Sequence, residues 1–367
     1  MEQLKDFIFE NTSLMTYLKK TPLPIVLYGM GDGAVKLLSI LNENGIKCSG
    51  VFASDEFARY NEFCSYTVKK LSDIESEFDE FIILVSFATK VDSVRERIFD
   101  ISKKHELYVP DINVSGDALE IFNEDFLEKY YPRLNRVFLS LDTVRARKMF
   151  SALINFKFSG KIKYLEEMEA LRVEDEFTLD SERIKSFADF GAYTGDTLKE
   201  ALALYPSLTR AAAFEPDLKN FKKLSLFNET FPVKTDLFPY AVHSDNTDVD
   251  MVQGAGRNTT IRNNAFTKTR LSEKKTQTIC ARRADSVMNF IPDLIKMDVE
   301  GNEINALEGC RNFFENASPV LRISIYHNNR DLFEVFEKIE ELKKGYKFTI
   351  SQKCRYIPAW DVELVAY

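Results

Sequence analysis

Residues 189–197 read DFGAYTGDT, and they connect a predicted apolar strand, Ser186–Phe190, to a predicted helix. Glycines in such a turn let a ligand approach the backbone at the helix N-terminus. The next predicted strand, Ala211–Phe214, ends at Glu215, 24 positions after Gly191. An acid at that spacing accepts hydrogen bonds from ribose hydroxyls in nucleotide-binding sheets. The stretch therefore predicts a parallel α/β sheet with a nucleoside-type ligand at its strand ends.

The chemistry of the turn favours one ligand class. A dinucleotide site favours the pattern GxGxxG, because pyrophosphate requires several unobstructed N–H groups at the helix N-terminus. Here the turn has fewer glycines and carries Asp189 and Asp196. Carboxylates suit a ligand with an ammonium group and no phosphate, and S-adenosylmethionine is such a ligand. An ordinary strand–helix turn without a ligand is the alternative.

Strands and helices alternate on both sides of a helical stretch, which predicts two α/β domains. In the first, strands are predicted at Ile25–Tyr28, Ile46–Phe52, Phe81–Val85 and Leu107–Val109, and helices at Val35–Asn44 and Lys90–Lys104. Apolar residues then recur at helical spacing through Asp117–Tyr131 and Asp142–Phe156, with Pro132 between them. We therefore expect an N-terminal domain (1–116), a helical connector (117–180) and a C-terminal domain (181–367).

The C-terminal domain ends on two strands without an intervening helix. Its helices are predicted at Thr197–Tyr205, Leu218–Phe227, Ile304–Phe314 and Leu332–Lys344, and its further strands at Leu237–Val242, Val249–Val252, Leu294–Val299, Val320–Tyr326, Tyr346–Ser351 and Val362–Tyr367. Adjacent strands that are joined without a crossover helix are antiparallel. The sequence thus predicts a mostly parallel sheet that ends in an antiparallel hairpin.

Composition excludes several classes of protein. The 367 residues are 45% hydrophobic and 29% charged, as in folded globular chains, and the net charge is −8. Such a charge argues against nucleic-acid binding as the main role. We find no run of about 18 apolar residues and no signal peptide, so we expect a cytoplasmic protein without membrane insertion. The five cysteines lack any CxxC pair and predict neither a disulfide framework nor a thiolate zinc site.

Two further strands end in side chains that suit catalysis. Asp298 follows one apolar strand and His327 follows the next. Ligands bind outside the carboxyl ends of strands in open α/β sheets, so both side chains are expected at the same crevice. A buried carboxylate is costly without a partner, which makes Asp298 a functional candidate. A hydrogen-bonded surface histidine is the alternative for His327.

The C-terminal half resembles the FkbM-type S-adenosylmethionine-dependent methyltransferases. The resemblance covers roughly residues 185–367. It rests on five ordered motifs: DFGAYTGDT (189–197), AAAFEPDLKNFKKL (211–224), PYAVHSD (239–245), IKMDVEGNEINALEGC (295–310) and ISIYHNNRDL (323–332). It implies the doubly wound sheet of class I methyltransferases with a C-terminal antiparallel hairpin, and O-methylation as the activity.

The resemblance also implies roles for individual residues. Asp298 and Glu300 match the fourth-strand motif, and His327 matches the fifth-strand motif. The expected cofactor-binding residues are Asp189, Gly191, Ala192, Tyr193, Gly195, Asp196, Thr197, Glu215, Pro216, Ala241 and Asp298. Family members often place an Arg-His pair after the sixth strand, where this chain has QKCR at 352–355, so no site is assigned there.

A basic stretch lies between the predicted third and fourth strands of this domain. From Arg257 to Arg283 there are eight Lys or Arg residues and one acid, preceded by Gly254 and Gly256. The stretch suits a lid that attracts an anionic acceptor, such as a phosphate-linked sugar, and a solvated loop is the alternative. Asp285, just after it, is interpreted either as a site acid or as a helix N-cap.

The N-terminal domain carries a second glycine turn. Gly29, Gly31 and Gly33 follow the first strand, and Asp55 lies at the tip of the next, a spacing found in nucleotide-binding Rossmann domains. The domain is similar to those that accompany sugar-modifying enzymes. Nucleotide or nucleotide-sugar binding competes here with a module used only for docking or dimerisation.

The leading hypothesis is methyl transfer from S-adenosylmethionine to a hydroxyl of a sugar or another small polar metabolite. His327 suits the role of general base, oriented by Asp298. One rival is an NAD(P)-dependent oxidoreductase or isomerase that uses the N-terminal domain, and another is a non-catalytic interaction protein. No metal site is assigned, although Asp298 and His327, with Asp285, leave metal dependence open. Whether the chain forms a homo-oligomer also stays open.

Overall fold

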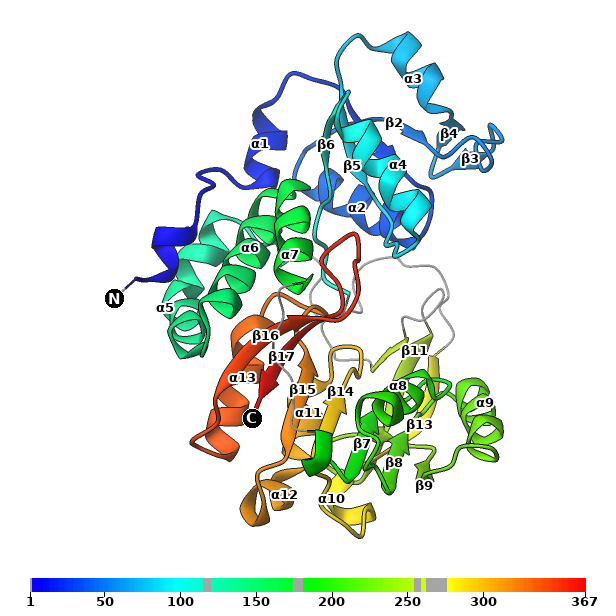
Figure 1. Ribbon diagram of the computed structural model, residues 1–367. Coiled ribbons are helices and arrows are strands. Elements are labelled where there is room, and N and C mark those ends of the chain that lie inside the picture. Colours follow the sequence, from blue (N-terminus) through cyan, green and yellow to red (C-terminus); the bar gives the residue numbers. More distant parts are fainter. Residues whose placement is uncertain (1, 115–119, 174–180, 254–258, 262–275) are drawn as a thin grey trace.

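The computed structural model describes residues 2–114, 120–173, 181–253, 259–261 and 276–367. Figure 1 shows an N-terminal sheet with its helices, a group of three helices, and a C-terminal sheet with its helices. One cluster of buried apolar side chains draws on all three parts, including Tyr28, Phe150 and Ile323. The three parts therefore share a core. Within the described ranges, no helix has both the length and the apolar character needed to cross a membrane.

The N-terminal sheet has six strands in the order β3-β4-β2-β1-β5-β6. The strands are β1 (Ile25–Tyr28), β2 (Cys48–Phe52), β3 (Glu62–Phe63), β4 (Tyr66–Lys69), β5 (Ile82–Val85) and β6 (Glu106–Tyr108). The helices are α1 (Leu14–Lys20), α2 (Asp32–Glu43), α3 (Leu71–Glu77) and α4 (Asp92–Ser102), preceded by a 3-10 turn at Leu4–Phe7. The central strands β1 and β5 are apolar and buried throughout, as parallel strands covered on both faces must be. The segment β3-β4-α3 was not predicted, because its strands are short and half-exposed.

Three helices follow: α5 (Glu124–Ser140), α6 (Val144–Ser159) and α7 (Lys163–Val173). Side chains of Asn123 and Thr143 accept hydrogen bonds from backbone N–H groups and cap α5 and α6. Pro132 lies inside α5 and does not separate two helices, so the predicted break there is wrong. The buried face of α5 continues past it through Leu134 and Phe138. This packing outweighs the loss of one backbone hydrogen bond.

The C-terminal sheet has seven strands in the order β16-β17-β15-β14-β7-β8-β9. They are β7 (Ser186–Phe190), β8 (Arg210–Phe214), β9 (Lys234–Phe238), β14 (Leu294–Met297), β15 (Val320–Ser324), β16 (Phe348–Gln352) and β17 (Val362–Ala366). All neighbours are parallel except β17, which is antiparallel to both β15 and β16. The doubly wound sheet with a C-terminal antiparallel hairpin is confirmed.

Helices flank this sheet: α8 (Asp196–Leu204), α9 (Leu218–Asn228), α10 (Ala284–Val287), α11 (Glu303–Glu308), α12 (Arg311–Asn316) and α13 (Asp331–Leu342), with a 3-10 turn at Ser181–Arg183 before β7. The single helix predicted at Ile304–Phe314 is two helices, α11 and α12. The first turn of α12 receives a hydrogen bond from outside, because the carboxylate of Asp285 accepts from Asn312 N at 3.0 Å.

A small separate sheet was not predicted. Its order is β10-β13-β11-β12, formed by β10 (Ala241–Val242), β11 (Thr247–Gln253), β12 (Thr259–Ile261) and β13 (Thr276–Arg282). The strand predicted at Leu237–Val242 is therefore divided, with β9 in the large sheet and β10 in the small one. The basic stretch lies partly in β12 and β13. The remainder, 254–258 with Gly254 and Gly256, and 262–275, lies outside the described residues, as does most of the predicted lid.

Candidate functional site

A cavity lies at the carboxyl ends of β7, β8, β14 and β15, where the sequence places its ligand. Eight of the predicted site residues line it: Gly191, Tyr193, Asp196, Thr197, Glu215, Pro216, Ala241 and Asp298. Four others lie behind its wall: Asp189, Ala192, Gly195 and His327. Asp189, Ala192 and His327 have no exposed surface. The structure thus brings the strand-end residues of the C-terminal domain to one place.

The glycine turn is shaped by contact with the neighbouring strand. Gly191 has φ +86°, and an added Cβ would lie 2.0 Å from the carbonyl oxygen of Asp298. Only glycine fits at this position, because both the space and the left-handed backbone exclude a side chain. Tyr193 also has a positive φ, of 48°. The turn therefore holds the backbone of residues 191–193 tightly against β14 and presents it to the cavity.

Glu215 fixes the other side of this turn. Its Oε2 accepts from Tyr193 N and its Oε1 accepts from Asp217 N, both at 2.9 Å. Burial raises the pKa of Glu215 to about 7, although the two backbone N–H groups oppose the rise. Each carboxylate oxygen can accept a second hydrogen bond. Glu215 therefore has the capacity to receive ribose hydroxyls while it holds the turn.

Lys296 stands between Asp189 and the cavity. Its Nζ lies 3.3 Å from Asp189 Oδ1 and donates to Gly191 O at 3.1 Å. Burial alone would lower the pKa of Lys296, but the carboxylates of Asp189 and Asp298 outweigh burial and raise it. Lys296 lines the cavity, whereas Asp189 does not. The contact expected between Asp189 and the methionine part of the cofactor would thus run through Lys296.

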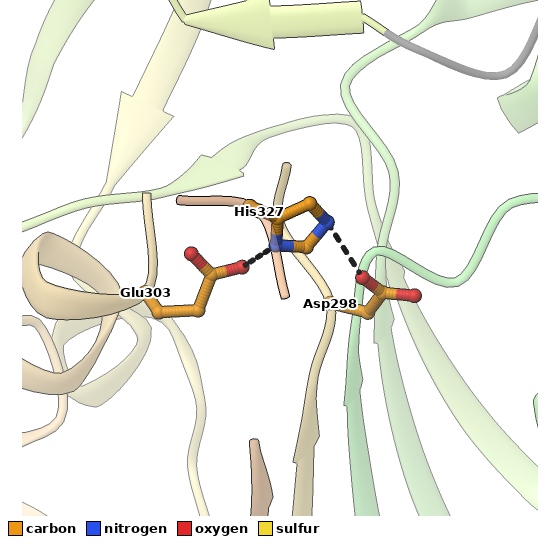
Figure 2. A group of neighbouring side chains, drawn as sticks. All are labelled: Asp298, Glu303 and His327. Atoms are coloured by element: carbon orange, nitrogen blue, oxygen red, sulfur yellow. Dashed lines mark ion pairs between the residues drawn. The ribbon is translucent and has the colours of Figure 1, made fainter. Parts of the chain in front are cut away.

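His327 lies between two carboxylates (Figure 2). Its Nε2 is 3.2 Å from Asp298 Oδ1, and its Nδ1 is 3.0 Å from Glu303 Oε1. Glu300 Oε2 is 3.7 Å from the same Nε2. Asp298, Glu303 and His327 bring metal-ligand types of atom within 4.8 Å of one another. The predicted proximity of Asp298 and His327 is therefore present, and two glutamates join them.

The charges of this cluster set its protonation. Burial alone would lower the pKa of His327, but Glu303, Asp298 and Glu300 raise it well above the ordinary value. Burial opposes the effect of Lys296 and His327 on Asp298, yet their charges hold the pKa of Asp298 below its usual range. The pKa of Glu300 is raised to about 7 by burial and by the nearby Asp298. The charges around the pair Asp298–His327 therefore favour the ionised form of each side chain.

Several cavity residues were not found from the sequence. Those whose charge or ring bears on the site are Lys90, Tyr240, Lys296, Lys353, Asp361 and Glu363. Lys353 and Cys354 come from the stretch 352–355, to which no site was assigned, because the loop between β16 and β17 returns to the cavity. For these residues the sequence offered one signal, which is that Lys296 is a lysine inside an otherwise apolar strand at 294–297. Lys90 comes from the N-terminal domain, so no local pattern indicates it.

Asp285 lies apart from the His327 cluster. It pairs with Arg283, at 2.7 Å between Nη2 and Oδ2, and accepts from Asn312 N. The N-cap of α10 is Arg283, so Asp285 lies inside the first turn and is not the N-cap. Asp285 is therefore a structural acid that joins β13 to α12.

The N-terminal glycine turn is explained largely by packing. An added Cβ at Gly33 would lie 2.2 Å from Ser86 O, and one at Gly29 would lie 2.6 Å from the Phe87 ring. An added Cβ at Gly31 meets nothing within 4 Å, and Asp55 is exposed. Two of the three glycines are thus required without any ligand. The nucleotide site expected here stays a prediction.

Comparison with known proteins bears on the C-terminal half in sequence and on the whole chain in fold. Residues 189–348 match the family model described as methyltransferase FkbM domain. The solved structure of methyltransferase FkbM from Methylobacillus flagellatus KT is similar over 99% of this chain and 93% of its own, with 16% identity and a TM-score of 0.66. A putative O-methyltransferase from Klebsiella pneumoniae is 12% identical over 66% of this chain and 94% of its own, but a TM-score of 0.32 is too low to carry an argument. No curated protein matches the sequence.

Proposed function

We propose that this chain, whose C-terminal half is an S-adenosylmethionine-dependent methyltransferase domain of the FkbM type, methylates a hydroxyl of a small polar metabolite, with sugars as the acceptor class. The observation that carries the proposal is a single cavity bordered by the glycine turn, Glu215 and Asp298. When bound, S-adenosylmethionine supplies a methyl group whose bond to sulfur breaks as the bond to the acceptor oxygen forms.

The cofactor fits the residues at one end of the cavity. Glu215 has free acceptor capacity for ribose hydroxyls, and the backbone of 191–193 faces the methionine part. Tyr240 and Ala241 lie where the adenine is expected. Among the described residues that line the cavity there are eight carboxylates and three lysines. This excess of negative charge suits a cationic cofactor and disfavours an acceptor rich in phosphate.

Asp298 and Glu300 form the carboxylate edge at the acceptor end of the cavity. We infer that this edge holds the acceptor hydroxyl and takes its proton as the methyl group is transferred, because both side chains line the cavity whereas His327 has no exposed surface. His327 supports Asp298 from behind, and Tyr326 donates to Asp298 Oδ1 at 3.1 Å. Positioning of the acceptor oxygen against the methyl group then supplies most of the rate enhancement. The general-base role expected of His327 requires a neutral ring, which its three carboxylate neighbours oppose.

Methyl transfer from labelled S-adenosylmethionine to a panel of sugars tests the proposal. We expect Asp298→Asn to lower the transfer rate by about 100-fold, within the range of such groups. Binding of S-adenosylhomocysteine, measured by calorimetry, should change less than threefold in that variant. Asp285→Asn, whose side chain lies outside the cavity, is the matched control and should keep the wild-type rate. Absence of S-adenosylhomocysteine binding to the wild type would refute the proposal.

A further inference from the structure

Two carboxylate oxygens of the edge formed by Asp298 and Glu300 lie near one ring nitrogen of His327. Asp298 Oδ1 and Glu300 Oε2 lie 3.2 and 3.7 Å from His327 Nε2. Neighbouring ligands of a divalent cation with bonds of about 2.1 Å are roughly 3.0 to 3.5 Å apart. The first distance lies within this range and the second is 0.2 Å longer, so both carboxylates are within reach of a cation bound at Nε2. The three side chains also come from consecutive strand ends, β14 and β15, which hold them in place.

The opposite nitrogen of His327 has the partner that metal-binding histidines require. Glu303 Oε1 lies 3.0 Å from Nδ1, and the Glu303 side chain is fully buried. The same oxygen accepts from Val299 N at 3.1 Å and from Gly301 N at 3.4 Å. A carboxylate on one ring nitrogen orients the ring and leaves the other nitrogen free to bind a metal.

The cluster is unsatisfied as it stands. His327 has no exposed surface, and neither ring nitrogen makes a hydrogen bond of acceptable geometry, although carboxylates lie close by. Glu303 Oε2 is also buried without a hydrogen-bond partner. Such groups are costly in a protein interior. A cation at Nε2 would replace the proton that the carboxylates favour there, while Glu303 completes the ring's interactions on the other side.

The backbone at Glu300 supports the same conclusion. Glu300 has φ +56°, a left-handed conformation that is rare for a residue other than glycine or asparagine. This conformation directs Glu300 to the cavity beside Asp298, where both side chains remain partly exposed. Strained backbone of this kind is concentrated at functional sites.

We propose that Asp298, Glu300 and His327 Nε2 bind one divalent cation, with Glu303 as the positioning residue for His327. A mixed set of imidazole and carboxylate suits Mn²⁺ and related first-row cations. The cation faces the cavity on the side where Asp298 and Glu300 are exposed. This inference rests on the proposed function, because an acceptor hydroxyl bound to the cation there would ionise more readily.

Titration of the full chain with MnCl₂, followed by electron paramagnetic resonance and calorimetry, tests the site. We expect one Mn²⁺ per chain, with a spin-echo modulation from a directly bound nitrogen. Glu303→Gln should weaken Mn²⁺ binding by about 10- to 100-fold, as loss of such an outer partner does elsewhere. Asp298→Asn and His327→Gln should abolish it. Glu200→Gln changes a glutamate of the same cavity outside the cluster, and Mn²⁺ affinity should stay within twofold.

Binding of S-adenosylhomocysteine to each variant shows that the cavity is intact. If Mn²⁺ does not bind to the wild type, or binds equally to wild type and His327→Gln without nitrogen modulation, the cation site is refuted. In that case methyl transfer can still proceed, and only the cation is lost. Conversely, Mn²⁺ binding with no methyl transfer to any acceptor would sustain the site and refute the proposed acceptor class.

Discussion

At the residue scale, Glu215 combines a structural task with a proposed binding task. It holds the backbone at Tyr193 and Asp217, and it lies at the position expected for a ribose-binding acid. Its folded-state pKa of about 7 lies above the ordinary 4.5. The native state therefore binds more protons than the unfolded chain between these values, and the contribution of Glu215 to stability falls as pH rises through that window.

This shift predicts a pH-dependent cofactor affinity. Ribose hydroxyls donate to a carboxylate and the cofactor is cationic, so binding favours ionised Glu215. Below its pKa, binding must release the proton, and S-adenosylmethionine affinity should rise between pH 5 and pH 7, by at most tenfold per pH unit, then level off. Calorimetry across this range measures the slope. Glu215→Gln should bind more weakly and without this slope, whereas Glu200→Gln should retain it. A flat wild-type profile would contradict the prediction.

Sequence patterns predicted which residues lie at the strand ends, but not which of them line the cavity and which are covered by a neighbour. Gly191, Glu215 and Asp298 follow apolar strands, so a local pattern predicted their place at the cavity. Lys296 and Asp189 occupy adjacent strands in register, and only the folded sheet shows that the lysine covers the aspartate. Glu303 is the first residue of α11, three positions after Glu300, where an acid is typical of a helix N-terminus. Its contact with His327 arises from tertiary packing.

At the element scale, apolar strands were predictable and polar ones were not. The central strands of the two large sheets are buried runs such as β5 and β14, which leave a clear signal. In the small sheet, β11 was predicted in part, at Val249–Val252, whereas β12 and β13 are rich in Thr and Arg and give no comparable signal. Pro132 in α5 shows a different error. The local rule that proline ends a helix predicted a break there, but the packing of α5 outweighs that rule. Patterns that depend on burial are thus recovered where burial is complete.

Helix α6 carries a buried ion pair that joins it to the segment after β6. Lys157 pairs with Asp111, and their side chains are only 2% and 4% exposed. Lys157→Met would leave Asp111 buried without its cation, and we expect a loss of about 3 to 5 kcal/mol in the free energy of unfolding, measured in denaturant. Lys103→Met removes an exposed pair with Asp100, and its unfolding midpoint should not change. Equal effects of the two substitutions would contradict the assignment.

At the scale of the whole molecule, the N-terminal half supports the loop that carries His327. Val114 N donates to His327 O at 2.7 Å, and Asn329 N donates to Asn113 Oδ1 at 3.0 Å. A second contact joins Thr89 to Ile357 through backbone hydrogen bonds in both directions. Lys90 beside it reaches the cavity. The N-terminal domain therefore contributes to the site whether or not it binds a nucleotide.

Asn113 provides a test of this support, because it lies outside the cavity and contacts the loop that carries His327. Asn113→Ala removes the acceptor of Asn329 N, so the segment 325–331 should open more often. Hydrogen exchange measured by mass spectrometry should show faster exchange in this segment, while peptides of β1 and β5 keep their protection. S-adenosylhomocysteine affinity should stay within threefold, because the glycine turn and Glu215 are remote from the change. Asn61→Ala, an exposed asparagine elsewhere in the N-terminal domain, should leave exchange in 325–331 unchanged. Unchanged exchange in the Asn113 variant would mean that the C-terminal sheet alone positions His327.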